Sequence, residues 1–550
     1  MPMEFGVPME PGSPRMSVSP SPRPSLPLGL LFAVFLGTFM ALLDVSIVSV
    51  ALPAMQHSLH VSVAALQWVV DAYTLCLSAL VLTGGSLGDR FGRKRLFLLG
   101  IGGFTAGSGL CAIATGYPML ITGRVVQGIA AAALMPGALA ILGHSFPEPG
   151  RRARVIGLWT ACAGLALVAG PLVGGLLVEA AGWPWIFVIN LPLGVLALVA
   201  GWRHIPESAD PAHASVDPAG QILGVAWLGA LAFGFIEAGN LGWASPAALA
   251  AFVGAAVTFA AFVAAELRSS APMLPIRLFA DPRFGLVNAA SFVIGFSAFA
   301  TFVILSLFLQ DLQRDSALVT GLHYLPLCVG QVLTATIAGR VTASRGTRLP
   351  MVAGLALMGA ALLAMTTFSA TTGSAWLSAV LALLGIGMGL GLPPVNVAAL
   401  AAVPRERSGV ASATTNAIRQ TGTTLGIALL GAILTTRATG HLTASLAAAG
   451  LAPGPAHRVA LQAVTLHSFP PGAADGVGGA TLARLYGLAF SSGFRAAMAL
   501  AGLASLAMAA AACGLGPSRR AAASPPGPRQ GSAVARPRGR RGVQANSQNE

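Results

Sequence analysis

Charged residues are scarce in this sequence. Asp, Glu, Lys and Arg make up only 9% of its 550 residues, whereas 55% are hydrophobic. An ordinary soluble domain is roughly 25% charged, and a soluble chain of this length would fold as several domains with charged surfaces. The composition therefore excludes an ordinary soluble protein. It favours a polytopic membrane protein, in which lipid replaces water over most of the surface.

Residues that carry catalytic or metal chemistry are also few. The five cysteines are scattered through apolar runs, and neither they nor the nine histidines have the spacing of a disulfide framework or a metal site. No Walker sequence is present for ATP hydrolysis. The formal net charge of +14 lies in short loops and a tail. We therefore expect no enzyme, no metal, no bound cofactor and no nucleic-acid partner.

Fourteen apolar runs are each long enough to cross a bilayer, which takes about 20 residues. They fall into a group of six, a group of two and a second group of six. They lie at about 29–52, 66–88, 96–115, 119–142, 155–178, 185–202, 219–238, 247–266, 284–309, 319–340, 350–369, 374–396, 409–434 and 493–515. The sequence therefore predicts an all-α polytopic membrane protein with 14 transmembrane helices.

The basic residues indicate the topology of these spans. Most of the 32 Lys and Arg residues fall in alternate loops and in the C-terminal tail. Loops on the cytoplasmic side carry such an excess of Lys and Arg, and a missed or added span would disrupt the alternation. We therefore expect a multi-pass protein of the cytoplasmic membrane with both termini in the cytoplasm.

An internal repeat divides the spans into two halves. The loop at residues 85–94 reads "GSLGDRFGRK" and the loop at 339–348 reads "GRVTASRGTR". Gly92 aligns with Gly346, whereas Asp89 aligns with Ala343, so the second copy lacks the acid. The predicted organisation is an N-terminal six-helix half at 29–203, an inserted helix pair at 219–266 and a C-terminal six-helix half at 284–515. Many secondary transporters are built from such repeats, with the binding site between them.

Three segments fall outside the spans. Residues 1–28 are rich in Pro and Ser, and residues 516–550 are rich in Arg, Pro, Gly and Ser, so both are predicted to be disordered and cytoplasmic. The basic tail either contacts anionic lipid or is an inert solvated tail. The stretch 435–490 is interrupted by Gly, Pro and His, and we expect an extracellular loop there.

Several motifs occur in order along the chain. They are "LDVSIVSVALP" at 43–53, the 85–94 loop, "RVVQG" at 124–128, "AGPLVGG" at 169–175, "WPWIFVINLPLG" at 183–194 and "RQTGTTLG" at 419–426. With these motifs the chain resembles the major facilitator superfamily, and within it the fourteen-span drug:proton antiporter group of the EmrB/QacA type. The resemblance runs from about residue 29 to residue 515.

The resemblance implies a function. It implies proton-coupled efflux of small hydrophobic compounds such as drugs, antibiotics or secondary metabolites, driven by the proton gradient, by a monomer in the lipid bilayer. The last six spans carry almost no acid, since Asp311 lies at an outer edge. Neutral, singly charged or anionic substrates are therefore preferred over dications. The alternatives are a proton-coupled symporter that imports a small nutrient and a membrane sensor that transports nothing.

Asp44 and Arg124 are ionisable residues inside predicted spans. Asp44 lies about nine residues, or ~13 Å, from the outer end of the first span, and Arg124 about six residues, or ~9 Å, from the outer end of the fourth. Their depths are close enough for contact. Such residues are costly in a bilayer and face a cavity or a partner. The resemblance implies proton coupling, and the alternative is a purely structural ion pair.

The 85–94 loop contains Gly85, Asp89, Arg90, Gly92 and Arg93. Its glycines permit a tight turn and close helix contact, and the acid can bind helix N-terminal amides or pair with Arg93. The resemblance implies a latch that holds the two halves together in one state. The alternative is a plain basic stop-transfer loop.

The fifth-span motif contains Gly170, Pro171, Gly174 and Gly175. Small residues let helices pack closely, and proline bends a helix. The resemblance implies that this bend favours antiport by sealing leakage paths. The family motif begins with a glycine four residues before Gly170, where this chain has Ala166, and plain packing is the alternative.

Five further polar residues lie in predicted spans or directly at their ends. Asp71 and Glu237 lie near outer ends and are either functional or interfacial. Arg419 is deeper and is a candidate cavity-lining cation. Asn190 and Gln310 either donate hydrogen bonds in a cavity or hold helices together.

Overall fold

The computed structural model describes residues 28–146, 148–209, 217–269, 272, 274, 276–403, 408–466, 469 and 478–514. These residues form helices and no strands. Fourteen of the helical segments in this part are long and apolar enough to cross a membrane, which confirms the predicted fold class. The termini predicted to be disordered, 1–28 and 516–550, lie outside the described residues except for Leu28.

The N-terminal half contains six spans, the sixth being split into two helices. These helices are α1 (Leu28–Leu59), α2 (Val63–Phe91), α3 (Arg93–Ala112), α4 (Tyr117–Ser145), α5 (Pro149–Ala181), α6 (Trp185–Val188) and α7 (Asn190–His204). Side-chain caps and glycines mark their ends. Ser62 accepts a hydrogen bond from the amide of Ala65 at the start of α2. Gly92, at φ +110°, separates α2 from α3.

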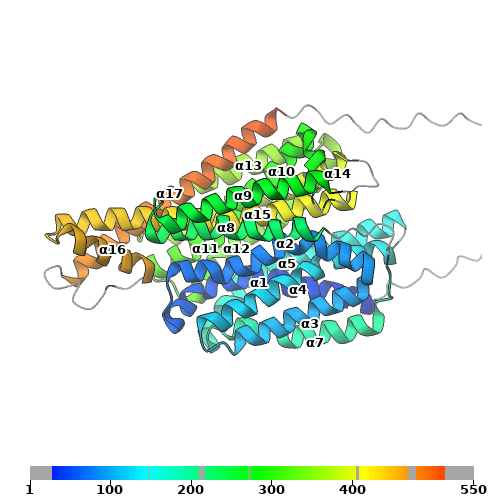
Figure 1. Ribbon diagram of the computed structural model, residues 1–550, viewed down its shortest axis with the longest axis horizontal. Helices are drawn as coiled ribbons and strands as arrows, with labels where there is room; N and C mark the ends of the chain where they lie inside the picture. The colour runs from blue at the N-terminus through cyan, green and yellow to red at the C-terminus, as the bar shows by residue number, and fades with distance from the viewer. Residues whose placement is uncertain are drawn as a thin grey trace, which may run out of the picture.

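The inserted pair consists of α8 (Pro218–Leu241) and α9 (Pro246–Arg268). Asp217 caps α8 through the amide of Gly220, at 2.8 Å, and a proline follows at the first helical position. α8 packs on both α2 and α15 and so bridges the two halves, as Figure 1 shows. α9 lies outside α8 and leaves apolar side chains such as Val253 and Val257 exposed.

The C-terminal half contains the remaining spans. Its elements are η2 (Ile276–Ala280), α10 (Pro282–Ile294), η3 (Gly295–Phe299), α11 (Ala300–Leu307), η4 (Phe308–Leu312), α12 (Ala317–Arg345), α13 (Arg348–Ala364), η5 (Met365–Thr367), α14 (Ser374–Ala401), α15 (Ser408–Ala448), α16 (Pro453–Leu466) and α17 (Gly479–Cys513). The ninth span joins α10, η3, α11 and η4, and both η3 and η4 are π-helical. Such π-helical turns inside α-helices are frequent at functional sites.

The stretch 435–490 is largely helical, in contrast to the loop expected from the sequence. α15 continues to Ala448, α16 follows, and α17 begins at Gly479. Gly450, at φ +102°, separates α15 from α16, so the glycine and proline interrupt the helices without preventing them. Alanine is the strongest helix former, and Ala456, Ala460 and Ala463 form the buried face of α16. In Figure 1, α16 projects from one end of the bundle.

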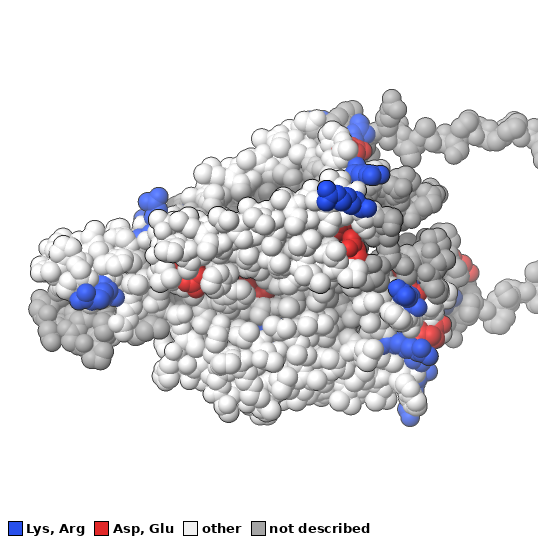
Figure 2. Space-filling model, viewed as in Figure 1, with Lys and Arg blue, Asp and Glu red and all other residues white. Residues whose placement is uncertain are grey.

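The two halves pack tightly at the end where α1 ends and α2 begins, which we call the outer end after the predicted topology. Gln310 donates to the carbonyl of Val50 at 2.9 Å, and Ser316 donates to Glu179 at 3.0 Å. Toward the inner end, a Cβ on Gly164 of α5 would have only Val332 within reach, at 4.0 Å. Figure 2 shows that most of the visible Lys and Arg side chains gather at the end opposite α16.

Candidate functional site

A buried polar cluster occupies the middle of the N-terminal half. Arg124 of α4 forms an ion pair with Asp44 of α1. Its Nε donates to the carbonyl of Val69 at 2.8 Å, and its Nη1 donates to Oε1 of Gln127 at 2.9 Å. The Arg124 guanidinium also lies 4.6 Å from the ring centroid of Tyr73. The guanidinium is therefore held by contacts with Asp44, Val69, Gln127 and Tyr73.

Gln127 extends this cluster to α3 and α7. Its Nε2 donates to Oδ1 of Asp44 at 3.1 Å and to Oγ of Ser108 at 2.8 Å. Asn190 donates to the same Ser108 oxygen at 3.3 Å. Asn190 therefore belongs to a contact between helices, which was one of the two roles expected for it. The sequence did not single out Gln127 or Ser108.

The ion pair is sealed from solvent. The exposed fraction is 0% for the Asp44 side chain and 1% for that of Arg124. Removal of one partner from such a pair leaves a buried uncompensated charge, which is strongly destabilising. The predicted contact between the two residues is present in the structure. Its role in proton coupling stays a prediction.

Asp71 is a second buried acid, and it lies on α2, which packs against α15 of the C-terminal half. Its side chain is fully buried, and neither carboxylate oxygen has a hydrogen-bond partner in the described part of the chain. It lies on the face of α2 that meets α15, because one turn further Thr74 accepts a hydrogen bond from Thr424 at 3.0 Å. The structure places the Asp71 side chain inside the protein.

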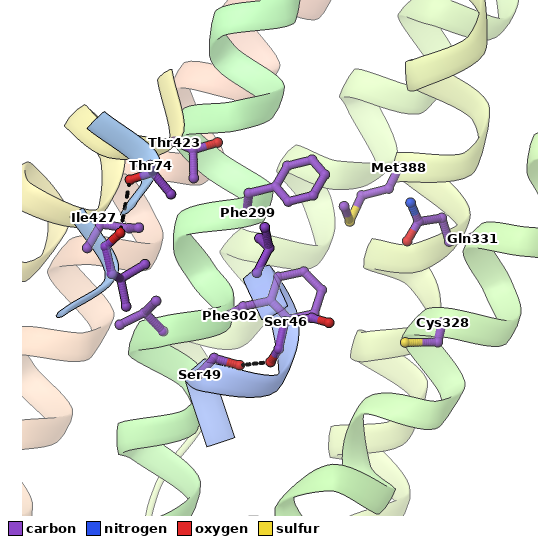
Figure 3. A pocket seen from close by; sticks show the side chains of 13 residues that line it. Ser46, Ser49, Thr74, Phe299, Phe302, Cys328, Gln331, Met388, Thr423 and Ile427 are labelled. Carbon is purple, nitrogen blue, oxygen red and sulfur yellow. Dashed lines mark hydrogen bonds between the residues drawn. The ribbon is translucent and has the colours of Figure 1, made fainter. Parts of the chain in front are cut away.

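A pocket lies between the two halves near the middle of the bundle, and Figure 3 shows its lining. α1 and α2 line it from the N-terminal half, and η3, α11, α12, α14 and α15 line it from the C-terminal half. The lining residues are Val45, Ser46, Ser49, Val70, Thr74, Phe299, Phe302, Val303, Cys328, Gln331, Met388, Thr423 and Ile427. None of them carries a carboxylate, a guanidinium or an ammonium group. The pocket is therefore an uncharged site with aromatic, hydroxyl and amide groups.

The five predicted cavity residues do not line this pocket. Asp71 and Asn190 are buried behind it in the N-terminal half. Gln310 lies in a separate depression at the outer end, and Glu237 lies four residues before the end of α8. The guanidinium of Arg419 lies 5.4 Å from the ring centroid of the pocket residue Phe299.

The 85–94 loop forms the turn between α2 and α3. Asp89 pairs with Arg93 at 2.7 Å, whereas the amide of Lys94 at the start of α3 donates to Glu207 at 3.0 Å. The acid at this helix N-terminus is therefore Glu207, which sequence analysis missed. Arg90 is exposed beside Phe91.

Two glycines of this loop, Gly85 and Gly92, have different surroundings. A Cβ on Gly85 would meet Pro136 at an ordinary 3.6 Å. The neighbouring Gly84 makes the close contact instead, because a Cβ there would lie 2.8 Å from the carbonyl carbon of Ala132. Gly92 has φ +110° and its repeat partner Gly346 has φ +84°. A glycine with positive φ therefore makes the tight turn in both halves, at Gly92 and at Gly346. The close packing of α2 against α4 occurs at Gly84 and not at Gly85.

The fifth-span motif packs α5 against two helices at once. A Cβ on Gly170 would lie 3.0 Å from the amide nitrogen of Ile47 in α1, and one on Gly174 would lie 2.8 Å from Cγ1 of the same residue. A Cβ on Gly175 would lie 2.8 Å from Cα of Leu318 in α12. Pro171 is buried in the same region. The motif therefore tightens contacts within the N-terminal half and between the halves.

A helical bundle of two halves with a pocket between them, in a chain with fourteen candidate spans, is the architecture of a secondary membrane transporter. The profile of the Major Facilitator Superfamily matches residues 34–427. The chain belongs to this superfamily, and its fourteen candidate spans fit the fourteen-span drug:proton antiporter group. The resemblance stated from the motifs is confirmed.

Similar proteins of known name are drug-resistance proteins of bacteria. Multidrug resistance protein Stp of Mycobacterium tuberculosis (strain CDC 1551 / Oshkosh) is 37% identical over 80% of this chain and 82% of its own. The tetracenomycin C resistance and export protein of Streptomyces glaucescens is 33% identical over 88% of this chain and 91% of its own.

A solved structure shows the same fold. It is a bacterial homologue of the human lysosomal transporter Spinster, in an inward-facing and unoccupied conformation. It superimposes with a TM-score of 0.61 at 18% identity and covers 88% of this chain and 96% of its own. At this identity the similarity supports the fold alone.

Proposed function

We propose that the chain exports small, largely apolar compounds such as drugs or antibiotics across the cytoplasmic membrane in exchange for protons. The observation that carries the proposal is an uncharged pocket lined from both halves, with the buried acids Asp44 and Asp71 in the adjacent N-terminal half. Two relatives carry the names multidrug resistance protein and tetracenomycin C resistance and export protein, which support the same activity. The activity is transport and involves no chemical conversion.

The acids supply the proposed coupling. Asp71 is a buried carboxyl group with no hydrogen-bond partner in the described part of the chain, which makes it one candidate to carry the proton. Asp44 is compensated by Arg124. A change in the distance between Asp44 and Arg124 would separate the buried carboxylate from the charge that compensates it. Each protonation state would then favour one arrangement of the halves, which is a population shift biased by the proton.

The arrangement in the structure corresponds to an inward-facing state in this proposal. The halves are joined at the outer end through Gln310 and Ser316, and the basic residues mark the opposite, cytoplasmic end. Both termini lie in the cytoplasm in this orientation. The functional unit is one chain in the bilayer, with a small molecule as its partner.

Reconstitution into liposomes tests the direction of coupling. In vesicles whose proteins expose the basic loops to the bath, an acidic lumen should drive a fluorescent probe into the lumen faster than in protein-free vesicles. A symporter would instead move the probe out of the lumen under the same gradient. A flux that is the same with and without the gradient, over a panel of apolar probes, would contradict proton coupling.

A further inference from the structure

Arg419 is a cation that has no counter-ion among the described residues, and it lies beside an otherwise uncharged pocket. Its Nη2 donates to Oδ1 of Asn416, one turn earlier on α15, and its guanidinium lies 5.4 Å from the ring centroid of Phe299. Both contacts are with neutral groups. In the described part of the chain no carboxylate forms an ion pair with it, and its side chain is partly exposed.

The position of Arg419 places its charge at the edge of the pocket. Thr423 and Phe299 both line the pocket. The Thr423 hydroxyl donates to the Arg419 carbonyl at 3.2 Å, so the arginine lies one turn of α15 toward the inner end. The π-helical segment η3 carries Phe299 at its end and approaches α15 closely, since a Cβ on Gly295 would lie 3.0 Å from the amide nitrogen of Thr423.

The buried acids of the N-terminal half are too far along the bundle to neutralise this cation. α2 and α15 run in opposite directions, and Thr74 is paired with Thr424. One turn back on α2, Asp71 therefore lies level with residues near 427, about two turns or ~12 Å from Arg419 along the helix axis. Asp44 is already paired with Arg124.

An uncompensated guanidinium at an aromatic pocket selects its ligand by charge. Arginine binds carboxylates through two parallel, charge-assisted hydrogen bonds, whereas a ligand cation would be repelled. Phe299 and Phe302 offer apolar faces to the body of the ligand. We infer that Arg419 anchors the acidic group of the substrate, so that the pocket prefers aromatic compounds with one carboxylate over neutral or cationic compounds of the same shape. The inference rests on the proposed export function and names its substrate class.

Three probes that share one fluorescent ring system test the inference: anthracene-9-carboxylate, anthracene-9-methanol and 9-(aminomethyl)anthracene. Their charges at neutral pH are negative, zero and positive. Binding to the purified full-length protein in detergent should be tightest for the carboxylate, by about tenfold over the alcohol, because charge-assisted hydrogen bonds are roughly twice as strong as neutral ones. The amine should bind most weakly.

Variants of Arg419 separate charge from shape. Arg419→Gln should reduce the affinity for the carboxylate to that for the alcohol and leave the alcohol unchanged, and Arg419→Lys should retain part of the preference. Arg495→Gln is the matched control, because it removes one positive charge from an exposed position on α17. It should leave all three affinities unchanged.

Two results would overturn the inference. One is a wild-type protein that binds the alcohol or the amine as tightly as the carboxylate, which needs no variant and no folding control. The other is a preference for the carboxylate that survives Arg419→Gln. Failure of the export proposal looks different, since it would show as no gradient-dependent flux for any of the three probes. Flux with no charge preference would retain export and reject the role of Arg419.

Discussion

At the scale of single residues, the Asp44–Arg124 pair is either a coupling element or structural, and a double substitution distinguishes the two. Either Asp44→Asn or Arg124→Gln alone leaves a buried group without its partner, and we expect a loss of about 3–5 kcal/mol of unfolding free energy. The double variant removes both charges and should recover most of that stability. Gradient-driven efflux should still be absent from the double variant, because it has no carboxylate at position 44 to carry the proton.

The measurement is thermal unfolding in detergent together with flux in proteoliposomes for all three variants. A double variant that regains wild-type flux along with its stability would mean that the pair is purely structural. Ser108→Ala serves as a control within the same cluster, since it removes two neutral hydrogen bonds, from Gln127 and Asn190, and no charge.

Asp71 gives a second residue-scale prediction. Because the Asp71 carboxyl group has no hydrogen-bond partner in the described part of the chain, Asp71→Asn breaks no ion pair and should lower the unfolding free energy by much less than Asp44→Asn does. The same variant should lose most of its gradient-driven flux, since it removes a group that can bind a proton. Glu237→Gln, an acid in the inserted pair, is the matched control and should transport normally. Full transport by Asp71→Asn would exclude Asp71 as a proton carrier.

The buried charged residues could be predicted from the sequence, whereas the residues that line the pocket could not. Asp44 and Arg124 could be paired from depth alone, because an ionisable group in a span is rare and needs a partner. The pocket is lined by residues such as Ser49, Phe302 and Met388. These residue types also fill ordinary helix contacts, so no sequence signal separates pocket from packing. Only the arrangement of helices from both halves does so.

At the scale of helices, the glycine motif of α5 makes a packing prediction. Gly170→Ala should reduce the unfolding free energy by about 1–3 kcal/mol, as overpacking does, because the added Cβ would lie 2.8 Å from Cβ of Ser46. Gly164→Ala on the same helix is the control, since its Cβ would meet nothing closer than 4.0 Å. Thermal unfolding of both variants measures the difference. Equal stabilities would show that α1 and α5 can move apart at no cost.

Helix positions were predictable from apolar length, whereas helix junctions were not. All fourteen spans were found from runs of about 20 residues, but α15 extends beyond its apolar run to Ala448. The π-helical segments η3 and η4 were not predicted, because single π turns inside α-helices are rare and have no known residue pattern in these stretches. Glu207 lies on the segment after α7, and its contact with Lys94 spans 113 residues.

At the scale of the whole molecule, the two halves repeat a structure but divide the charges. Gly92 and Gly346 make the same turn in both halves, whereas the buried ion pair occurs in the N-terminal half and the uncompensated Arg419 in the C-terminal half. α8 closes one seam between the halves by packing on α2 and α15. In the proposed mechanism, the proton binds to Asp44 or Asp71 in the N-terminal half, and Arg419 in the C-terminal half binds the substrate. The two events are therefore coupled through the relative position of the halves.

We predict that the conformation of the molecule depends on the pH at its closed outer end. Asp315 lies at this end, with its Oδ2 3.4 Å from Nε2 of His323. It lines a depression together with other titratable residues, which are His57, Glu179, Asp311 and Arg314. Burial raises the pKa of Asp315, and the nearby His323 partly offsets this by lowering it. In an opened outer end Asp315 would be solvated, with the ordinary aspartate pKa of about 3.9. The closed state therefore binds this proton more tightly than the open state does.

The sign follows from linkage. The contribution of Asp315 to closure is present in full below the ordinary aspartate pKa and is lost as pH rises through the raised pKa of the closed state. External acid should therefore favour closure, which is the direction that proton uptake from outside requires for export. Spin labels on the outer ends of α5 and α12, in a cysteine-free background, should report a shorter distance as the pH falls. Asp315→Asn should weaken this response, and an unchanged response would assign the pH dependence to the buried acids Asp44 and Asp71.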